Sequence, residues 1–211
     1  ISVCEEMRIY YQQIGSNKKI MIVASPVVQE NYKLQLFDER KLKLINGIWN
    51  LKACTGNKFI KEVNPMNTTG LSRERVVKQI KKIIRQSYEF LGYTEFANKI
   101  DKLIKKVSGQ SDKKIFIRQK RIIEKEFSDR LLVIDEVHNI RSNDIKRRTT
   151  KNMLDLVSYA KNMKLLLLTA TPMFNEATEI VWLANLMNLN DKRFPINIKD
   201  IFDANGNFIK D

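Results

Sequence analysis

The chain has 211 residues, 43% of them hydrophobic and 29% charged, which is enough to bury one full core and a small second one. No stretch approaches the roughly 18 to 20 consecutive apolar residues that a membrane-spanning helix needs, and the longest candidate covers only residues 165–168. Residue 1 is isoleucine and no secretory signal follows it, so we expect an internal part of a longer intracellular protein.

The charge of the chain is strongly basic and unevenly distributed. It has 38 Lys and Arg against 24 Asp and Glu, a net charge of +14, which indicates a polyanionic partner. Residues 72–127 carry a net charge of +9, whereas residues 151–211 are neutral. A local excess of this kind favours a stripe that holds phosphates; the alternative is a solvated helical surface.

The cysteines and the histidine restrict the metal chemistry. Cys4 and Cys54 stand fifty positions apart without a CxxC pair, which excludes a disulfide framework and a cysteine-based zinc site, and we expect two reduced, buried thiols. His138 is the only histidine, and no second His or Cys stands at ligand spacing from it, so zinc is rejected.

Helix and strand signals alternate along the chain. The stretch 41–63 has mixed signals and is interpreted as strand and loop, and Ser72 has the character of an N-cap before an apolar stripe. The predicted elements are, in chain order, a helix at 1–14, a buried strand at 20–24, helices at 27–38 and 72–84, a strand at 87–91, helices at 94–107 and 113–127, a strand at 130–135, a helix at 144–162, a strand at 165–168 and a helix at 176–187.

This alternation predicts a doubly wound α/β sheet, whose functional groups gather at the carboxyl ends of the strands. Four consecutive aliphatic residues at 131–134 have the pattern of a buried parallel strand. The two tryptophans, Trp49 and Trp182, stand among aliphatic residues and are assigned to packing.

Polar residues follow two of the predicted strands directly. Asp135 and Glu136 come after the strand at 131–134, and Thr169 and Thr171 come after the next strand. An acidic pair in this position suits metal-assisted phosphoryl chemistry, in which one carboxylate holds Mg²⁺ and the other activates water; the alternative is an N-cap of the next segment. His138, two residues beyond Glu136, could link that site to neighbouring polar groups.

These stretches resemble known motifs. Residues 134–139 (IDEVHN) and 168–173 (LTATPM) resemble motifs II and III of superfamily 2 helicases and translocases. Residues 24–32 (ASPVVQENY) resemble motif Ia. The wording of 54–59 (CTGNKF) and 88–96 (YEFLGYTEF) is similar to the Snf2-like ATPases of large nucleocytoplasmic DNA viruses, among them the helicase-like subunit of the poxvirus early transcription factor and its giant-virus relatives.

The resemblance implies a RecA-like P-loop NTPase lobe, a parallel sheet flanked by helices, with ATP and Mg²⁺ as cofactors. It implies that Asp135 binds Mg²⁺ through water, that Glu136 activates the attacking water, and that His138 relays to motif III. It further implies that Thr169, Ala170 and Thr171 couple the presence or absence of the γ-phosphate to the strength of nucleic-acid binding. The expected nucleic-acid contacts are Ser25, Pro26 and Gln29 from the motif, and Lys78, Lys81 and Lys82 from the basic helix.

One departure from the family pattern is large. No G-x-x-x-x-G-K-[ST] occurs, and Gly56-Asn57-Lys58 lacks both the preceding glycine and the following hydroxyl. We expect the first strand and the phosphate-binding loop to lie upstream of Ile1, and a second lobe with an arginine finger to lie elsewhere in the parent protein. The 211 residues alone are therefore expected not to hydrolyse ATP.

The resemblance thus implies a helicase lobe at 1–187, with an insert at about 41–86 and basic helices at about 94–127, and a connection to the second lobe at 188–211. The insert is either an accessory surface or a loop packed over the sheet. The parent would couple ATP hydrolysis to translocation on DNA or to promoter remodelling in viral transcription. Duplex DNA is the expected track. RNA polymerase or a second transcription-factor subunit would be its partner, in the virion or a cytoplasmic viral factory.

Two alternatives remain open at this stage. One is a catalytically inactive module that binds DNA or a transcription partner. The other is a cellular Snf2-like remodeller or a restriction translocase. An acidic pair at a strand end argues against the inactive module, because a scaffold has no physical need for it.

Overall fold

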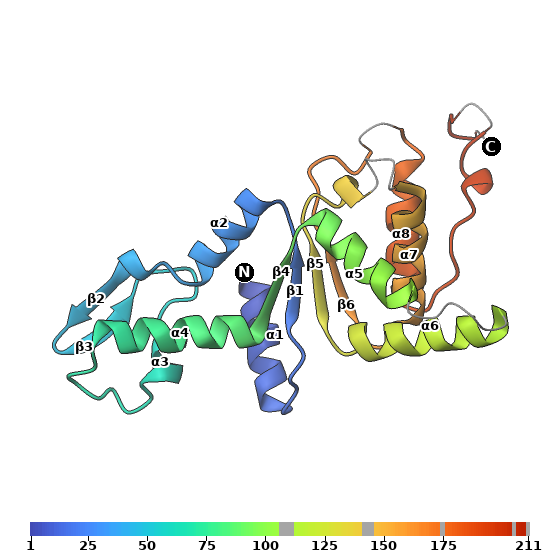
Figure 1. The fold of residues 1–211 in the computed structure, drawn as a ribbon. Coiled ribbons are helices and arrows are strands. Elements are labelled where there is room, and N and C mark those ends of the chain that lie inside the picture. Colours follow the sequence, from blue (N-terminus) through green and yellow to red (C-terminus); the bar gives the residue numbers. More distant parts are fainter. Residues whose placement is uncertain (106–111, 141–145, 174–175, 204–205, 210–211) are drawn as a thin grey trace. The chain divides into compact units, whose positions relative to one another are not determined.

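The chain is an α/β protein, as predicted (Figure 1). The computed structural model describes residues 1–105, 112–140, 146–173, 176–203 and 206–209. The chain divides into two compact units, Ile1–Phe90 and Leu91–Asp211, and each is described by itself below. In the described part of the chain, no helix is long and apolar enough to cross a membrane.

The first unit holds most of the predicted helices and strands of the N-terminal half, with small shifts at their ends. Its elements are α1 (Ser2–Gln13), β1 (Ile20–Val23), α2 (Pro26–Leu36), a 3-10 turn (Glu39–Lys41), β2 (Leu42–Ile45), β3 (Ile48–Leu51), α3 (Lys58–Val63), α4 (Arg73–Ser87) and β4 (Tyr88–Leu91).

The second unit carries the predicted basic helices and the two strands that precede the candidate motifs. Its elements are α5 (Tyr93–Lys105), α6 (Asp112–Phe127), β5 (Leu131–Ile134), a 3-10 turn (Val137–Ile140), α7 (Lys146–Tyr159), β6 (Lys164–Leu167), α8 (Glu179–Asn190) and a 3-10 turn (Ile198–Asp200). Residues 188–211, predicted as a connection, therefore include the end of α8 and a short turn.

Four strands form one sheet in the order β4-β1-β5-β6. All four residues of β1 and all four of β5 are buried, which is why both read as unbroken aliphatic runs in the sequence. Strands β5 and β6 pair in parallel, with Leu131 opposite Lys164 and Ile134 opposite Leu167. Parallel pairing brings the carboxyl ends of these strands to the same edge, where the candidate motifs begin.

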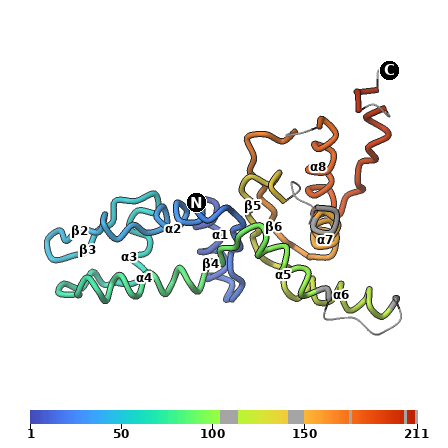
Figure 2. The backbone as a smooth tube through the Cα atoms, turned by 45° about the horizontal axis from the view of Figure 1, so that its top comes forward, coloured from blue at the N-terminus to red at the C-terminus, as the bar shows by residue number. Residues whose placement is uncertain are grey.

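The insert in the first unit is a hairpin followed by two helices. Strands β2 and β3 pair antiparallel, and Asn46 and Gly47 turn the chain between them with φ values of 51° and 74°. Two adjacent positive φ values match the twist of a two-residue hairpin, which Asn-Gly adopts at low cost. Helix α3 lies against β3 and α4 (Figure 2). Trp49 packs here, and its indole Nε1 donates to the carbonyl oxygen of Leu71 at 2.7 Å.

The interpretation of residues 41–63 as strand and loop missed α3. This helix has only six residues, too few for a helical period to show in the sequence, and it forms because Phe59 and Ile60 are buried. The expectation for the cysteines was half right: Cys4 is buried, whereas Cys54 is exposed in the turn before α3. Ser72 is the predicted N-cap, and its hydroxyl accepts from the Arg75 amide at 3.3 Å.

A buried ionic cluster joins three elements of the first unit. The side chains of Glu5 and Arg8 on α1 are almost fully buried, and Arg8 Nε lies 3.1 Å from Glu5 Oε1. Arg8 also contacts Glu62 on α3 at 2.8 Å, and Tyr88 on β4 donates its hydroxyl to Glu5 at 2.5 Å. Burial, together with the Glu5 carboxylate, raises the pKa of Tyr88, so the phenol stays a donor. Buried charges persist only with such partners.

The end of α7 in the second unit is capped by a lysine. The ammonium group of Lys192 donates to the carbonyl oxygens of Val157 at 3.0 Å, Ser158 at 2.9 Å and Ala160 at 2.6 Å. A cation placed at unpaired carbonyls is favourable at a helix C-terminus. Desolvation at this position lowers the pKa of Lys192. This contact fixes α7 relative to the turn after α8, close to β6.

Candidate functional site: the carboxyl edge of strands β5 and β6

The candidate site lies in the second unit, where β5 and β6 end. Asp135 follows β5 directly, and Thr169 stands two residues after β6. The Leu168 amide donates to the carbonyl oxygen of Ile134 at 2.9 Å, and the Val137 amide donates to the carbonyl oxygen of Leu168 at 3.1 Å. These backbone bonds extend the pairing beyond the strands, so residues 31 positions or more apart in the sequence meet in one turn region.

The acidic pair occupies a sharp turn with an unusual backbone. Glu136 has a φ of 46°, in the left-handed region that costs an ordinary side chain on the order of 1 kcal/mol or more. The Asp135 carboxylate stabilises the turn, because its Oδ1 accepts from the Glu136 amide at 3.0 Å. The Glu136 side chain is 42% exposed, so a water or substrate can reach it. Strained turns of this kind occur at functional sites more often than elsewhere.

His138 lies between the acidic turn and the two threonines after β6. Its Nδ1 is 3.3 Å from Oε2 of Glu136, 3.2 Å from the hydroxyl of Thr169 and 3.4 Å from the hydroxyl of Thr171. Glu136 Oε2 itself is buried and has no hydrogen bond of good geometry within the described residues, so we treat its approach to His138 as an electrostatic contact. The sequence placed the three groups at one sheet edge, and the structure brings them into contact.

The threonine turn has an internal bond of its own. The Thr171 amide donates to the hydroxyl oxygen of Thr169 at 3.1 Å, and Ala170 between them is exposed. Thr169 is therefore held by the backbone on one side and faces the imidazole on the other. A small displacement of this turn would change the distance between Thr169 and His138.

The donor set suits a hard cation held mainly through water. Within the described ranges, no cluster of three or more His, Cys, Asp or Glu side chains could hold a metal ion by itself. Mg²⁺ typically takes one or two carboxylates and completes its shell with water and substrate phosphates. Asp135 is half-buried at the strand end and offers such a carboxylate, so the residues present fit Mg²⁺ delivered with a nucleotide.

The predicted nucleic-acid residues of motif Ia lie in the first unit. Ser25 precedes α2 as its N-cap and Pro26 is the first helical residue, as the Ser-Pro pair predicted. The Gln29 side-chain amide donates to the carbonyl oxygen of Ala24 at 2.9 Å, which ties it to the end of β1. Ser25 is half-buried and Pro26 is exposed. The structure thus gathers these three residues at one strand end.

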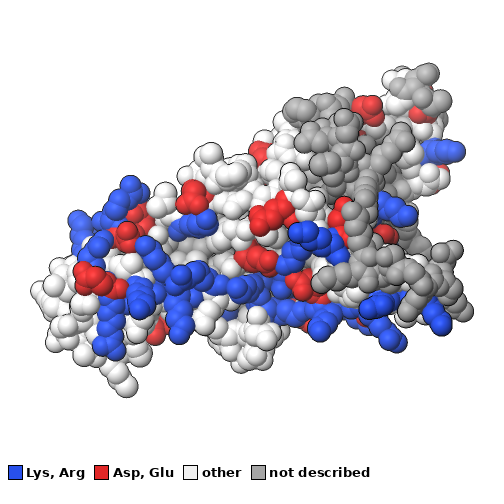
Figure 3. Space-filling model, viewed as in Figure 1, with Lys and Arg blue, Asp and Glu red and all other residues white. Residues whose placement is uncertain are grey.

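The predicted basic helix presents its lysines to solvent. Lys and Arg side chains gather along α4 (Figure 3). Val76 and Ile80 of the same helix are buried. Lys78 and Lys82 are exposed, whereas Lys81 is paired with Glu39 at 2.9 Å. The hydrogen bond from Lys81 lowers the pKa of Glu39. The basic stretch 72–127 also contains Lys102, which is exposed, and Lys105 and Lys106, whose side chains lie outside the described part of the chain.

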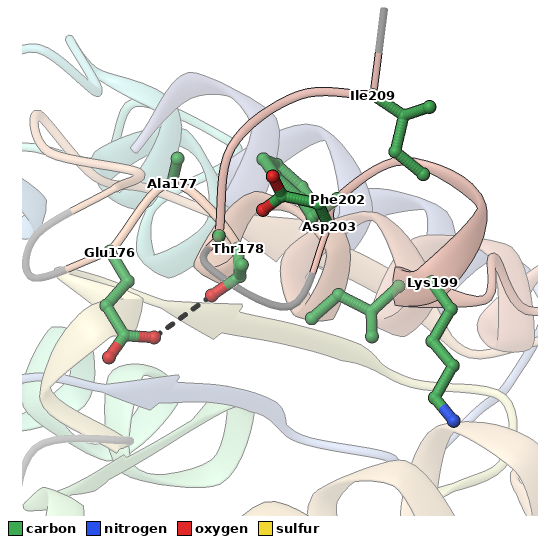
Figure 4. Close-up of a pocket in the computed structure, with 9 residues that line it drawn as sticks. Glu176, Ala177, Thr178, Lys199, Phe202, Asp203 and Ile209 are labelled. Atoms are coloured by element: carbon green, nitrogen blue, oxygen red, sulfur yellow. Dashed lines mark hydrogen bonds between the residues drawn. The ribbon is translucent and has the colours of Figure 1, made fainter.

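A cavity of about 900 Å³ opens elsewhere in the second unit (Figure 4). It lies at the start of α8 and the C-terminal turns, and the Thr178 hydroxyl donates to Glu176 at 3.1 Å on its wall. Lys199 and Asp203 also line it. None of the carboxylates or hydroxyls of the candidate site lines this cavity, so it carries none of the predicted chemistry.

Sequence reasoning did not single out Tyr93 and Asn139. The Tyr93 hydroxyl donates to the carbonyl oxygen of Asp135 at 2.8 Å, and the Asn139 side-chain amide lies 3.4 Å from the same hydroxyl. The sequence did contain a signal for Tyr93. It follows Gly92, which ends a predicted strand, and the carboxyl ends of parallel strands lie at one edge of the sheet.

Three curated proteins resemble the chain, and all three bear helicase names. One is a protein of Acanthamoeba polyphaga mimivirus described as an ATP-dependent RNA helicase, 24% identical over 97% of the chain and 17% of its own length. Another is a helicase of Invertebrate iridescent virus 3, 29% identical over 69% of the chain and 14% of its own length. The third is the killer plasmid pGKL-2 helicase of Kluyveromyces lactis, 31% identical over 39% of the chain and 13% of its own length.

The chain spans less than a fifth of the length of each of these relatives. No protein-family profile and no solved structure matches it. The chain is therefore similar to parts of two viral proteins and one yeast plasmid protein that are named as helicases. The four-stranded α/β sheet agrees with a RecA-like lobe.

Proposed function

We propose that this chain is part of a nucleic-acid-dependent ATPase, a helicase or DNA translocase of the Snf2-like branch. The observation that carries the proposal is the position of His138, whose Nδ1 lies 3.3 Å from Glu136 and 3.2 Å from Thr169. A single imidazole thereby contacts both the candidate water-activating carboxylate and the turn after the next strand. The helicase names of the three relatives support the same class of activity.

In this proposal the acidic turn performs the chemistry of hydrolysis. Bound Mg²⁺ would neutralise charge that develops on the phosphates of ATP during the reaction. Asp135, at the end of β5, would hold this ion through water. Glu136, exposed to solvent on one side, orients a water and accepts its proton.

The threonine turn then responds to whether ATP at the acidic turn has been hydrolysed. His138 transfers a change in the charge near Glu136 to the hydroxyls of Thr169 and Thr171, because it contacts all three side chains. The phosphates of the nucleic acid are contacted by two groups of residues. One is the motif at the start of α2, and the other is the basic face of α4: Ser25, Pro26 and Gln29, and Lys78, Lys81 and Lys82. Duplex DNA is the proposed track, although the mimivirus relative is named for RNA.

The remaining parts of the proposal concern the parent protein. Residues 1–187 form most of its first RecA-like lobe and 188–211 lead to a second lobe. A strand with the phosphate-binding loop pairs along β6, which is an edge strand among the described strands and has half-exposed leucines. The parent acts in infected cells, in the virion or viral factory, and remodels promoters together with RNA polymerase or a second transcription-factor subunit, as in the poxvirus early transcription factor.

The test is the ATPase rate of the full-length protein with Mg²⁺, measured without nucleic acid and with duplex DNA, single-stranded DNA or RNA of one sequence. We expect a rate stimulated most by duplex DNA. Glu136→Gln should lower it by about 10²-fold or more while ATP binding persists. Glu124→Gln is the matched control, because Glu124 pairs with exposed Lys161 on the surface.

Three outcomes would change the proposal. No hydrolysis together with retained DNA binding would establish a binding module instead. Stimulation by RNA alone would replace the DNA track with an RNA track. An unchanged rate in Glu136→Gln would remove this carboxylate from the role of base.

A further inference from the structure

A third strand end contributes a residue to the candidate site. Helix α5 begins at Tyr93, two positions after the last residue of β4, and Gly92 stands between them. The Glu95 carboxylate accepts from the Gly92 amide at 3.3 Å, which fixes the start of the helix. Tyr93 is thus held at the first turn of α5, and its hydroxyl reaches the turn after β5.

The phenol of Tyr93 contacts both ends of the acidic turn. It donates to the carbonyl oxygen of Asp135 at 2.8 Å, and the side-chain amide of Asn139 lies 3.4 Å from its oxygen. Between these two points, the backbone amide of Asn139 donates to the carbonyl oxygen of Glu136 at 2.9 Å. The hydroxyl thus bridges the first and last residues of a five-residue turn that contains the two carboxylates and the imidazole.

This bridge restrains the backbone of the strained residue of the turn, Glu136. Glu136 has a φ of 46°, and a residue in the left-handed region persists only where its surroundings hold it there. The Asp135 carbonyl group belongs to the peptide unit that precedes Glu136, so a hydrogen bond to it restrains the φ of that residue. Loss of the bond would let the turn relax toward an ordinary conformation and would move the Glu136 carboxylate.

We propose that Tyr93 is a positioning residue that holds the acidic turn in its strained conformation and thereby places Glu136 for water activation. The part of this inference that concerns water activation rests on the proposed function. The part that concerns the conformation of the turn does not. A displacement of a catalytic group by about 1 Å can lower a rate substantially even when substrate binding is unchanged.

The first test measures the turn itself. Amide hydrogen exchange over residues 135–140 is compared between the full-length protein and its Tyr93→Phe variant, which keeps the ring and loses the hydroxyl. Faster exchange in the variant, in this segment and not throughout the second unit, is expected. Tyr159→Phe is the matched control, because the Tyr159 ring packs against Phe116 on α6, with ring centroids 5.6 Å apart. Equal exchange in Tyr93→Phe and wild type would overturn the positioning role.

The second test measures the consequence for hydrolysis. Tyr93→Phe should lower the nucleic-acid-stimulated kcat by about three- to tenfold, the effect of removing one neutral hydrogen bond, and should leave KM for ATP within about twofold of wild type. A change in KM alone, or equal decreases in Tyr93→Phe and Tyr159→Phe, would contradict the inference. A wild-type protein that hydrolyses no ATP would overturn the proposed function, and the exchange experiment would then decide the conformational role by itself.

Discussion

The Nδ1 atom of His138 lies 3.2 Å from the hydroxyl oxygen of Thr169, although 31 positions separate the two residues in the sequence. They meet because β5 and β6 pair in parallel and end at the same edge. The contact joins the turn with the acidic pair to the turn after the neighbouring strand. Under the proposed function, this contact is one link between the acidic turn and the second turn, beside the backbone bond from Val137 to Leu168 and the contact of His138 with Thr171.

The contact between His138 and Thr169 predicts strong coupling in a double-mutant cycle. His138→Ala and Thr169→Val should each lower the stimulated ATPase rate by about tenfold or less, the scale of a single hydrogen bond. The double variant should be hardly slower than the less active single variant, which corresponds to a coupling energy of about 0.5 kcal/mol or more. Thr178→Val is the control, since the Thr178 hydroxyl bonds to Glu176 instead. Independent, multiplicative decreases in rate would show that the contact between His138 and Thr169 does not contribute to hydrolysis.

The basic face of α4 predicts a change in the salt dependence of binding. Replacing Lys78 and Lys82 together with glutamine should reduce the slope of log affinity against log salt by about 0.9 for each phosphate that the protein no longer neutralises. Lys81→Gln should have a smaller effect, because the charge of Lys81 is paired with Glu39 at 2.9 Å. Fluorescence anisotropy with duplex DNA at several salt concentrations measures the slope. A slope equal to that of a Lys43→Gln control would mean that the stripe is only a solvated surface.

The buried cluster in the first unit predicts that two adjacent glutamates contribute very differently to the free energy of unfolding. Glu5→Gln removes the buried partner of Arg8 and should lower the free energy of unfolding by about 3 kcal/mol or more. Glu6→Gln should change it by less than about 1 kcal/mol, because Glu6 pairs with Lys58 on the exposed surface. Urea denaturation of both variants provides the comparison. Equal decreases in stability would show that the buried pair contributes no more than a surface pair.

Asp155 on α7 predicts a pH-dependent effect on stability. Desolvation by burial raises the pKa of Asp155, opposed by nearby Lys151. The folded chain therefore holds this proton more tightly than the unfolded chain does, and stability decreases as the pH rises from about 4 through the raised pKa. Asp155→Asn should thus stabilise the protein at pH 7, with a gain that vanishes below about pH 4.

The measurement is urea denaturation of Asp155→Asn and wild type at several pH values. Asp191→Asn, at the exposed C-cap of α8, is the control for the removal of one negative charge. A constant difference across the pH range would assign the effect to overall charge and not to the buried carboxyl group.

Most of the elements could be predicted from the sequence, because their apolar residues follow the period of the element they build. The runs at β1 and β5 are buried on both faces and read as unbroken aliphatic stretches. Helix α4 has an N-cap and an apolar stripe. By contrast, α3 has six residues, and its helical form depends on the burial of Phe59 and Ile60 against other elements, which no local pattern shows.

For the site, the sequence by itself determined which residues follow the strands: an acidic pair and the only histidine after one, and two threonines after the next. Only the tertiary structure decided which atoms meet. The contacts of His138 with Thr169 and of Tyr93 with Asp135 join residues 31 and 42 positions apart. Such distances depend on strand register, turn conformation and side-chain rotamers, and these are set by packing across the whole sheet.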